Sequence, residues 1–325
     1  MNAKKKKPKI VFLDAGTVNF GDVPLGIFNA LGHFKTFRMT RPAKIPARIR
    51  GAAIVITNKC RIDRRILEQS PDLKCICVAA TGTNNIDLKA AAERGVAVTN
   101  VAGYSTETVT QFTFAFILAL AGRLIPLNQA SHDGTWSHSP FPLLPDPRIR
   151  EVFGKTLGIL GYGAIGKRVA RIAKVFGMKV LVGKIPGRNY SPGQDVKRLS
   201  LAALAAQVDF LSIHAPLTPL TAGLINWRLL CKMKPSACLI NMARGGIVNE
   251  TDLRRALQSG RIAGAATDVL TQEPPPKGHV LLKAPHLLMT PHVAWASREA
   301  RTRLVAEIAE NMRAFLQGKR RNRVV

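Results

Sequence analysis

The chain has 325 residues, of which 46% are apolar, and this length and content exclude a disordered chain and predict two domains with separate cores. Its 48 lysines and arginines outnumber 20 aspartates and glutamates, so the formal net charge is +28. Such a charge is typical of nucleic-acid-binding proteins, although a total charge says nothing about the fold.

The excess positive charge is concentrated at the ends of the chain. Residues 1–50 carry 11 basic and 2 acidic side chains, and residues 298–325 carry 8 and 3, so these two tails supply half of the excess. Weak, salt-sensitive and non-specific association of the tails with nucleic acid is therefore kept as a secondary property.

Cysteine usage and hydropathy predict a cytoplasmic protein without a membrane span. The five cysteines are odd in number and lack metal-ligand spacing, so we expect reduced thiols and no metal site. The apolar run after Lys4–Lys7 is too short for a signal peptide, and Phe112–Gly122 is about half the length of a bilayer span.

The first hundred residues alternate short apolar runs with helical patterns. Runs rich in Val and Ile at 9–14, 53–57 and 75–79 predict buried strands of a parallel α/β unit. A long apolar helix is expected over 105–122. Residues 130–146 are rich in His, Ser, Pro and Asp, which predicts a loop that crosses between domains.

A second α/β series follows this loop. Its strand candidates, with helical patterns between several of them, are residues 156–160, 179–182, 210–213, 237–240 and 264–268. Strands that alternate with helices predict a second parallel sheet.

The sharpest motif is Gly161-Tyr-Gly-Ala-Ile-Gly166, which lies between an apolar strand and a helical pattern. In such a turn the first glycine allows a tight bend, the second lets the backbone approach a pyrophosphate, and the third lets helix and strand pack closely. The motif therefore predicts dinucleotide binding, against the alternative of a glycine turn without a ligand.

The acidic residue that usually binds the adenosine ribose is missing. No Asp or Glu occurs between Glu151 and Asp195, and the strand 179–182 is followed by Gly183-Lys-Ile-Pro-Gly-Arg188. With Lys184 and Arg188 near the ribose, a 2′-phosphate is accommodated, which favours NADP(H) and leaves NAD(H) possible. The alternative is that both are ordinary solvated cations.

Four further polar residues follow predicted strands: Arg244, Asp268, Glu273 and His292. At these residues the sequence resembles the D-isomer-specific 2-hydroxyacid dehydrogenases, in particular the glyoxylate and hydroxypyruvate reductase branch. The resemblance covers nearly the whole chain through motifs at 80–87, 161–166, 214–216, 241–245, 268–274 and 291–292.

The resemblance implies a role for each residue. Arg244 binds the substrate carboxylate and polarises the carbonyl, His292 is the general acid in reduction, and Glu273 favours its imidazolium. Backbone N–H groups of Thr81 and Gly82 bind the substrate carboxylate. The predicted cofactor-binding residues are Gly161, Gly163, Ala164, Ile165, Gly166, Lys184, Arg188, Pro216, Ala243 and Asp268, of which Asp268 orients the nicotinamide.

The remaining histidines receive no catalytic role. His214 is expected to be structural, and the other five are expected to be ordinary surface or core residues: His33, His132, His138, His279 and His286. Asp268 as a helix cap and Glu273 as a turn former remain the alternatives at those two positions.

By resemblance, the fold is α/β with two Rossmann-like or flavodoxin-like domains, parallel sheets and an active site in the cleft between domains. The substrate-binding domain is expected at 1–102 plus 291–325, and the dinucleotide-binding domain at 103–290. We expect a homodimer that reduces glyoxylate or hydroxypyruvate with NAD(P)H. The alternative is a cofactor-sensing, corepressor-like regulator whose basic tails contact nucleic acid.

Overall fold

The computed structural model describes residues 7–189 and 196–325, and the chain divides into two compact units. Residues 1–105 with 296–325 form the discontinuous unit, and residues 106–295 form the contiguous unit. Residues 291–295, expected in the discontinuous unit, thus belong to the contiguous one. The reason is local, because the N–H groups of Val293 and Ala294 donate to Asp268 of that unit.

The discontinuous unit contains a parallel sheet of five strands in the order β2-β1-β3-β4-β5. The strands are β1 Lys9–Phe12, β2 His33–Thr36, β3 Ile54–Thr57, β4 Cys75–Val78 and β5 Ala97–Thr99. This order is that of flavodoxin-like folds. The three buried strands predicted from sequence are confirmed. The other two were missed because β2 is a polar edge strand and β5 has three residues.

Short helices connect these strands, and a long C-terminal helix returns to the same unit. The helices are α1 Ile45–Ile49, α2 Arg64–Glu68, α3 Leu88–Glu93 and α10 Arg298–Leu316. Helix α10 is capped by Ser297 and buries Leu304, Ile308 and Met312. It also buries Arg301, whose guanidinium binds both carboxylate oxygens of Asp22 and holds the pKa of that carboxyl at about 2.

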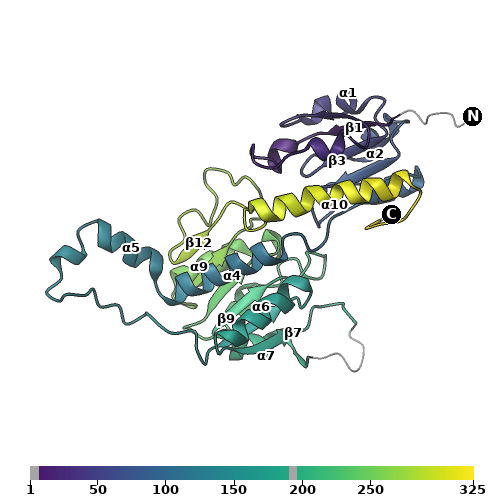
Figure 1. Cartoon of the computed structure of the whole chain (residues 1–325). Helices are drawn as coiled ribbons and strands as arrows, with labels where there is room; N and C mark the ends of the chain where they lie inside the picture. Colours follow the sequence, from purple (N-terminus) through teal and green to yellow (C-terminus); the bar gives the residue numbers. More distant parts are fainter. Residues whose placement is uncertain (1–6, 190–195) are drawn as a thin grey trace, which may run out of the picture. The chain divides into compact units, whose positions relative to one another are not determined.

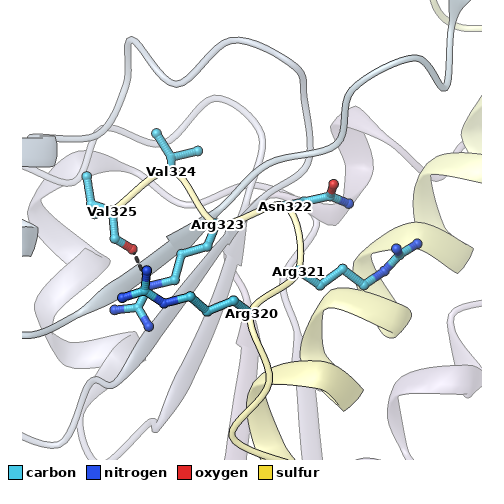
Figure 2. A pocket seen from close by; sticks show the side chains of 6 residues that line it. All are labelled: Arg320, Arg321, Asn322, Arg323, Val324 and Val325. Carbon is cyan, nitrogen blue, oxygen red and sulfur yellow. Dashed lines mark hydrogen bonds between the residues drawn. The ribbon is translucent and has the colours of Figure 1, made fainter.

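The basic C-terminal segment pairs with the edge of this sheet. Arg323 is bridged to Thr99 of β5 in antiparallel fashion, and the Val324 N–H donates to the Val98 carbonyl at 2.7 Å. Figure 2 shows these last residues, with the Arg320 and Arg323 side chains on one side of the chain and Arg321 on the other. A covered edge strand has fewer free backbone groups for unwanted pairing, so this segment has a structural role.

The contiguous unit contains a parallel sheet of seven strands in the order β12-β11-β10-β9-β6-β7-β8. The strands are β6 Thr156–Leu160, β7 Lys179–Gly183, β8 Arg198–Leu199, β9 Phe210–Ile213, β10 Cys238–Asn241, β11 Gly264–Thr267 and β12 Leu287–Met289. The order reverses between β6 and β9, as in dinucleotide-binding folds. The five strands predicted here are confirmed, and the short β8 and β12 were missed.

Both faces of this sheet are buried. Leu211 and Leu239 pack into one core cluster, whereas their neighbours Phe210 and Ile240 pack into another on the opposite face. The helices of this unit are α4 Thr106–Ala121, α5 Leu124–His132, α6 Ala164–Val175, α7 Leu201–Gln207, α8 Trp227–Leu230 and α9 Glu250–Gln258. Burial on two faces explains the continuous apolar strands of the sequence.

The segment after α4 differs from its prediction. Helix α5 and the chain that follows it extend away from the sheet of the contiguous unit (Figure 1). The predicted crossing between domains at 130–146 is wrong, because these residues lie inside the contiguous unit. Over residues 7–189 and 196–325, no single helix could cross a membrane. Helices α4 and α5 reach that length only as a pair bent by 62°.

Candidate functional site

The glycine turn joins β6 to α6, and its three glycines have different surroundings. Gly161 has a φ of +104°, and a Cβ there would lie 2.4 Å from the His214 carbonyl carbon. A Cβ on Gly166 would lie 2.1 Å from the Gly161 oxygen, whereas a Cβ on Gly163 would meet nothing within 4 Å. Packing therefore explains the first and third glycines, and open space at Gly163 fits a backbone approached by a ligand.

The start of α6 adds anion-binding capacity to this turn. Gly163 is the N-cap and has no side chain, so no side-chain cap is present at this helix end. The first N–H groups, those of Ala164, Ile165 and Gly166, have no partner within the helix and carry the positive end of its dipole. This arrangement suits the pyrophosphate of a dinucleotide.

The strand register places Lys184 next to the glycine turn, and Arg188 follows it in the same loop. Leu160 of β6 pairs with Gly183 of β7, so the residues that follow, Gly161 and Lys184, leave adjacent strands that are about 5 Å apart. Arg188 donates its N–H to the Ile185 carbonyl across a turn with Gly187 at φ +71°. Pro followed by such a glycine is typical of a type II turn. Both cationic side chains are exposed.

The His214-Ala-Pro216 turn packs against the glycine turn at Gly161. His214 Nε2 lies 2.9 Å from Ser212 Oγ, and burial lowers the pKa of its imidazole to about 4. The ring is therefore neutral near pH 7, in agreement with the structural role predicted for it. The Pro216 carbonyl accepts from Thr221 Oγ1 at 2.8 Å, which folds the following loop back on itself.

Arg244 lies directly after β10 in a loop fixed by Asn241. The Asn241 side chain donates to the Arg244 carbonyl at 2.9 Å and accepts from the Ala243 N–H at 3.1 Å. The guanidinium of Arg244 donates to the Ala243 carbonyl at 2.7 Å, and the residue is half-buried. Arg244 thus holds a cation at a strand end of an open α/β sheet, and such folds place their ligands at these strand ends.

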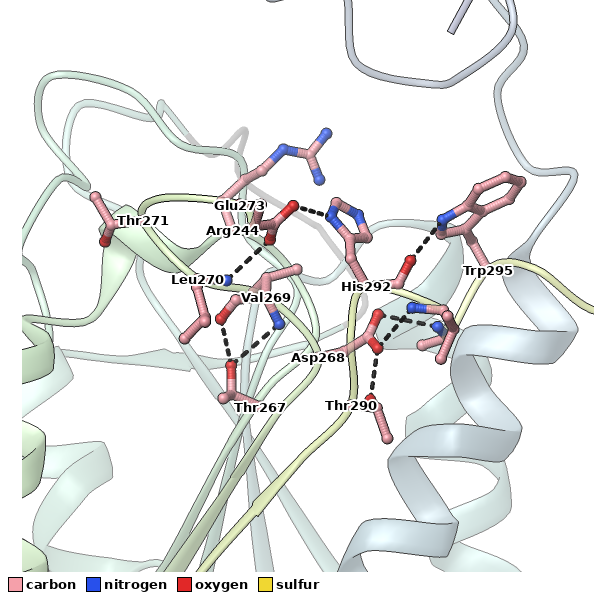
Figure 3. A network of polar contacts seen from close by, with 12 residues as sticks. Arg244, Thr267, Asp268, Val269, Leu270, Thr271, Glu273, Thr290, His292 and Trp295 are labelled. Carbon is pink, nitrogen blue, oxygen red and sulfur yellow. Dashed lines mark hydrogen bonds and ion pairs between the residues drawn. The ribbon is translucent and has the colours of Figure 1, made fainter. Parts of the chain in front are cut away.

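Glu273 and His292 form a close pair. Glu273 Oε2 lies 2.5 Å from His292 Nδ1, and Glu273 Oε1 accepts from the Leu270 N–H at 2.9 Å. The two side chains are 32% and 25% exposed, so the pair is accessible to a substrate. Figure 3 shows the Arg244 side chain extending on the side of the loops where this pair lies. The structure thus brings Arg244, Glu273 and His292 together.

Asp268 is buried beneath this pair. Its carboxylate accepts from Thr290 Oγ1 at 2.6 Å and from the N–H groups of Val293 and Ala294 at 2.9 Å each. Burial raises the pKa of this carboxyl, and the hydrogen bonds oppose the rise. The Asp268 side chain therefore fixes the conformation of the loop that contains His292, a residue with a φ of +55°. This contact was not foreseen, because the sequence suggested a role toward the nicotinamide or, as the alternative, a helix cap.

Thr81 and Gly82 belong to the discontinuous unit, where they follow β4. Thr81 Oγ1 donates to the Val101 carbonyl at 2.8 Å, and Asn100 Nδ2 donates to the Thr81 carbonyl at 2.7 Å. These bonds hold the loop at the carboxyl end of the sheet. Their part in binding substrate stays a prediction.

Other polar residues at the site were missed from the sequence. Glu250 accepts from the Thr271 N–H at 2.7 Å and lies 3.1 Å from His279, one of the histidines expected to be ordinary. Asn241 and Thr290 orient the loops of Arg244 and His292. Glu250 and Thr290 carry no local signal, since they act on Thr271 and Asp268, which are 21 and 22 residues distant in sequence.

The fold and these residues define an α/β oxidoreductase that binds a dinucleotide. Comparison with known proteins narrows this class: residues 114–294 match the family model described as D-isomer specific 2-hydroxyacid dehydrogenase, NAD binding domain. The chain belongs to this family. It is 40% identical over 317 residues to a glycerate dehydrogenase from Methylorubrum extorquens, over 97% of this chain and 98% of that protein.

Solved structures agree with this membership. The TT0316 protein from Thermus thermophilus is 33% identical with a TM-score of 0.86, over 98% of this chain and all of that one. An NADPH-dependent glyoxylate/hydroxypyruvate reductase from Sinorhizobium meliloti, solved with NADP and malonate, is 27% identical with a TM-score of 0.80 over 96% and 94%. Nothing in these comparisons supports the regulatory alternative.

Proposed function

We propose that this dehydrogenase reduces glyoxylate or hydroxypyruvate to the corresponding 2-hydroxy acid, with NADPH as the preferred cofactor. The observation that carries the proposal is the Glu273–His292 pair beside Arg244 at the strand ends of a dinucleotide-binding unit. Reduction of a 2-oxo acid needs a proton donor for the developing alkoxide and a cation for the carboxylate and carbonyl. These residues supply both.

His292 is the proton donor of this proposal. Its Nδ1 faces Glu273, which leaves Nε2 to give a proton to the substrate oxygen. The Glu273 carboxylate fixes the orientation of the ring. When bound, the nicotinamide cofactor supplies the hydride.

Arg244 binds the substrate carboxylate and draws charge from the carbonyl. Its guanidinium is planar and always charged, which suits a carboxylate. The N–H groups of Thr81 and Gly82 complete carboxylate binding. In this proposal the discontinuous unit therefore binds substrate, and the contiguous unit binds cofactor.

The preference for NADPH rests on the basic turn after β7. Lys184 and Arg188 follow β7, where a ribose-binding acid usually lies, and both are exposed. A 2′-phosphate there gains two cations, and the described residues of this turn, 183–189, carry no carboxylate. Asp268, Pro216 and Ala243 are proposed to complete the cofactor site.

The experiment that tests substrate and cofactor together is a kinetic panel. Glyoxylate, hydroxypyruvate, pyruvate and two bulkier 2-oxo acids are compared with NADPH and with NADH by absorbance at the nicotinamide band. The proposal expects the highest kcat/KM for glyoxylate or hydroxypyruvate with NADPH. A bulkier 2-oxo acid as the best substrate contradicts the proposed substrate. Equal kcat/KM with NADH and NADPH contradicts the proposed cofactor preference.

We also propose a homodimer in the cytoplasm. The segment from α5 to the start of β6 exposes large apolar side chains, namely Leu124, Ile125, Trp136, Phe141, Leu143, Ile149 and Phe153. Exposed apolar side chains along one segment favour protein association, and a second copy of the chain would bury the same segment on both sides. All five cysteines are free thiols, which agrees with a reducing compartment.

A further inference from the structure

The loop that carries Arg244 and the loop that carries Glu273 touch through their backbones. A Cβ on Gly245 would lie 1.9 Å from the Leu270 carbonyl carbon and 2.2 Å from the Thr271 nitrogen. The peptide between Leu270 and Thr271 therefore lies directly against the Gly245 Cα. This contact fixes how far apart the two loops are.

Two carboxylates hold the two consecutive N–H groups of this segment. The Leu270 N–H donates to Glu273, which in turn faces His292. The Thr271 N–H donates to Glu250 Oε1 at 2.7 Å. The Leu270–Thr271 peptide, whose N–H is held by Glu250, is therefore joined through the Leu270 Cα to the Val269–Leu270 peptide, whose N–H donates to Glu273.

Glu250 is itself held in place. It is the first residue of α9, where a negative charge is favourable, and its side chain is 14% exposed. Its second oxygen lies 3.1 Å from His279 Nε2, and His279 Nδ1 accepts from the Leu281 N–H at 3.3 Å. Because Nδ1 accepts, Nε2 carries a proton and donates to Glu250.

We infer that Glu250, buttressed by His279, is a positioning residue for the Glu273–His292 pair. The effect travels along the backbone at Leu270, which joins the peptide held by Glu250 to the peptide whose N–H donates to Glu273. Without the acceptor at Glu250, the Thr271 N–H is left without its partner and the peptide is free to turn. Glu273 then loses the geometry that orients His292.

This inference rests on the proposed function, and a matched pair of variants tests it. Glu250→Gln keeps an oxygen for the Thr271 N–H, whereas Glu250→Met has a side chain of similar length without any oxygen. The control is the same pair of changes at Glu93, an exposed residue of the other unit that is paired with Arg64. Steady-state kinetics, NADPH binding and melting temperature are measured for these four variants and for His279→Leu.

The expected result is a rescue by the conservative change. Glu250→Met lowers kcat about 10-fold or more, because the His292 ring is no longer held in the orientation needed for proton transfer. NADPH affinity stays within about 2-fold. Glu250→Gln stays within about 3-fold of the parent enzyme, and both Glu93 variants match it. His279→Leu gives a smaller loss in the same direction as Glu250→Met.

A Glu250→Met enzyme with the kcat of the parent overturns the inference. So does a loss of activity that only follows the folded fraction at the assay temperature, or an equal loss for Glu250→Gln. If Glu250→Met does not fold, His279→Leu decides by kcat and NADPH affinity. The proposed function is tested by a different variant. Turnover retained by His292→Ala would contradict the proposed function, whatever the Glu250 variants show.

Discussion

The carboxylate of Glu273 meets the imidazole of His292 at 2.5 Å, although the two residues come from loops after different strands. Residue 273 follows β11 and residue 292 follows β12. Buried Asp268, at the start of the first loop, accepts three hydrogen bonds from the second. The buried Asp268 carboxylate thus joins the two loops that carry the accessible Glu273–His292 pair.

Replacing Asp268 tests this support. In Asp268→Asn the amide group faces backbone N–H donors, so at least one of the three hydrogen bonds is lost. We expect a loss of about 1–3 kcal/mol in the free energy of unfolding and a fall in kcat of at least about 10-fold. Thr290→Val removes only one donor and is expected to cost about 1 kcal/mol. Urea unfolding and steady-state kinetics check both values. An Asp268→Asn variant as stable as the parent contradicts the claim that Asp268 stabilises the loop of His292.

The glycines of the turn after β6 are expected to separate folding from binding. Gly166→Ala places a Cβ 2.1 Å from the Gly161 oxygen, so the free energy of unfolding falls by about 1–3 kcal/mol. Gly163→Ala has open space around its Cβ and leaves stability within about 0.5 kcal/mol, yet it weakens NADPH binding at least about 10-fold. Thermal unfolding and fluorescence titration of NADPH distinguish them. Unchanged cofactor affinity in Gly163→Ala contradicts the predicted approach of the pyrophosphate.

The basic turn is expected to act on one cofactor only. Lys184→Ala with Arg188→Ala lowers kcat/KM for NADPH by about 10- to 100-fold, because two charge-assisted contacts to the 2′-phosphate are lost. The value for NADH changes by less than about 3-fold. A parallel change at Lys179, the exposed first residue of β7, serves as control. Equal losses for both cofactors would sink the assignment of this turn.

His214 is expected to make stability depend on pH. Its pKa is about 4 in the folded chain and about 6.5 when unfolded, so the unfolded state binds the proton first as pH falls. Stability from this group is complete above about pH 6.5 and is lost toward pH 4, by up to about 3 kcal/mol. Urea unfolding at pH 7.5 and 4.5 compares the parent with His214→Gln. The glutamine variant should lose less stability across this interval, and an equal loss contradicts burial of a neutral ring.

The sequence predicted the parts of the fold whose signal is local. Buried strands such as 54–57 and 210–213 are continuous apolar runs, and the glycine turn has a fixed spacing. Edge strands β2 and β8 are polar or very short, so they carry no such pattern. Residues 130–146 look like any polar connection, and nothing local shows that they belong to one unit.

The candidate site was predictable to a similar depth. Arg244, Glu273 and His292 are found from motifs that follow strands. The hydrogen bonds of Asp268 and Glu250 to other loops depend on which loops meet in space. A Glu near the start of a helix also has many local explanations. His279 was set aside as ordinary because a single histidine has no distinguishing spacing. Contacts between distant segments are what the sequence pattern does not contain.

The central claim is that His292 gives the proton to the reduced 2-oxo acid. The most direct measurement is turnover of glyoxylate and hydroxypyruvate with NADPH by His292→Ala, alongside NADPH affinity of the same protein. We predict that kcat falls by at least about 100-fold while NADPH affinity stays within about 3-fold, because the ring acts in the chemical step. Turnover near that of the parent enzyme would contradict the account.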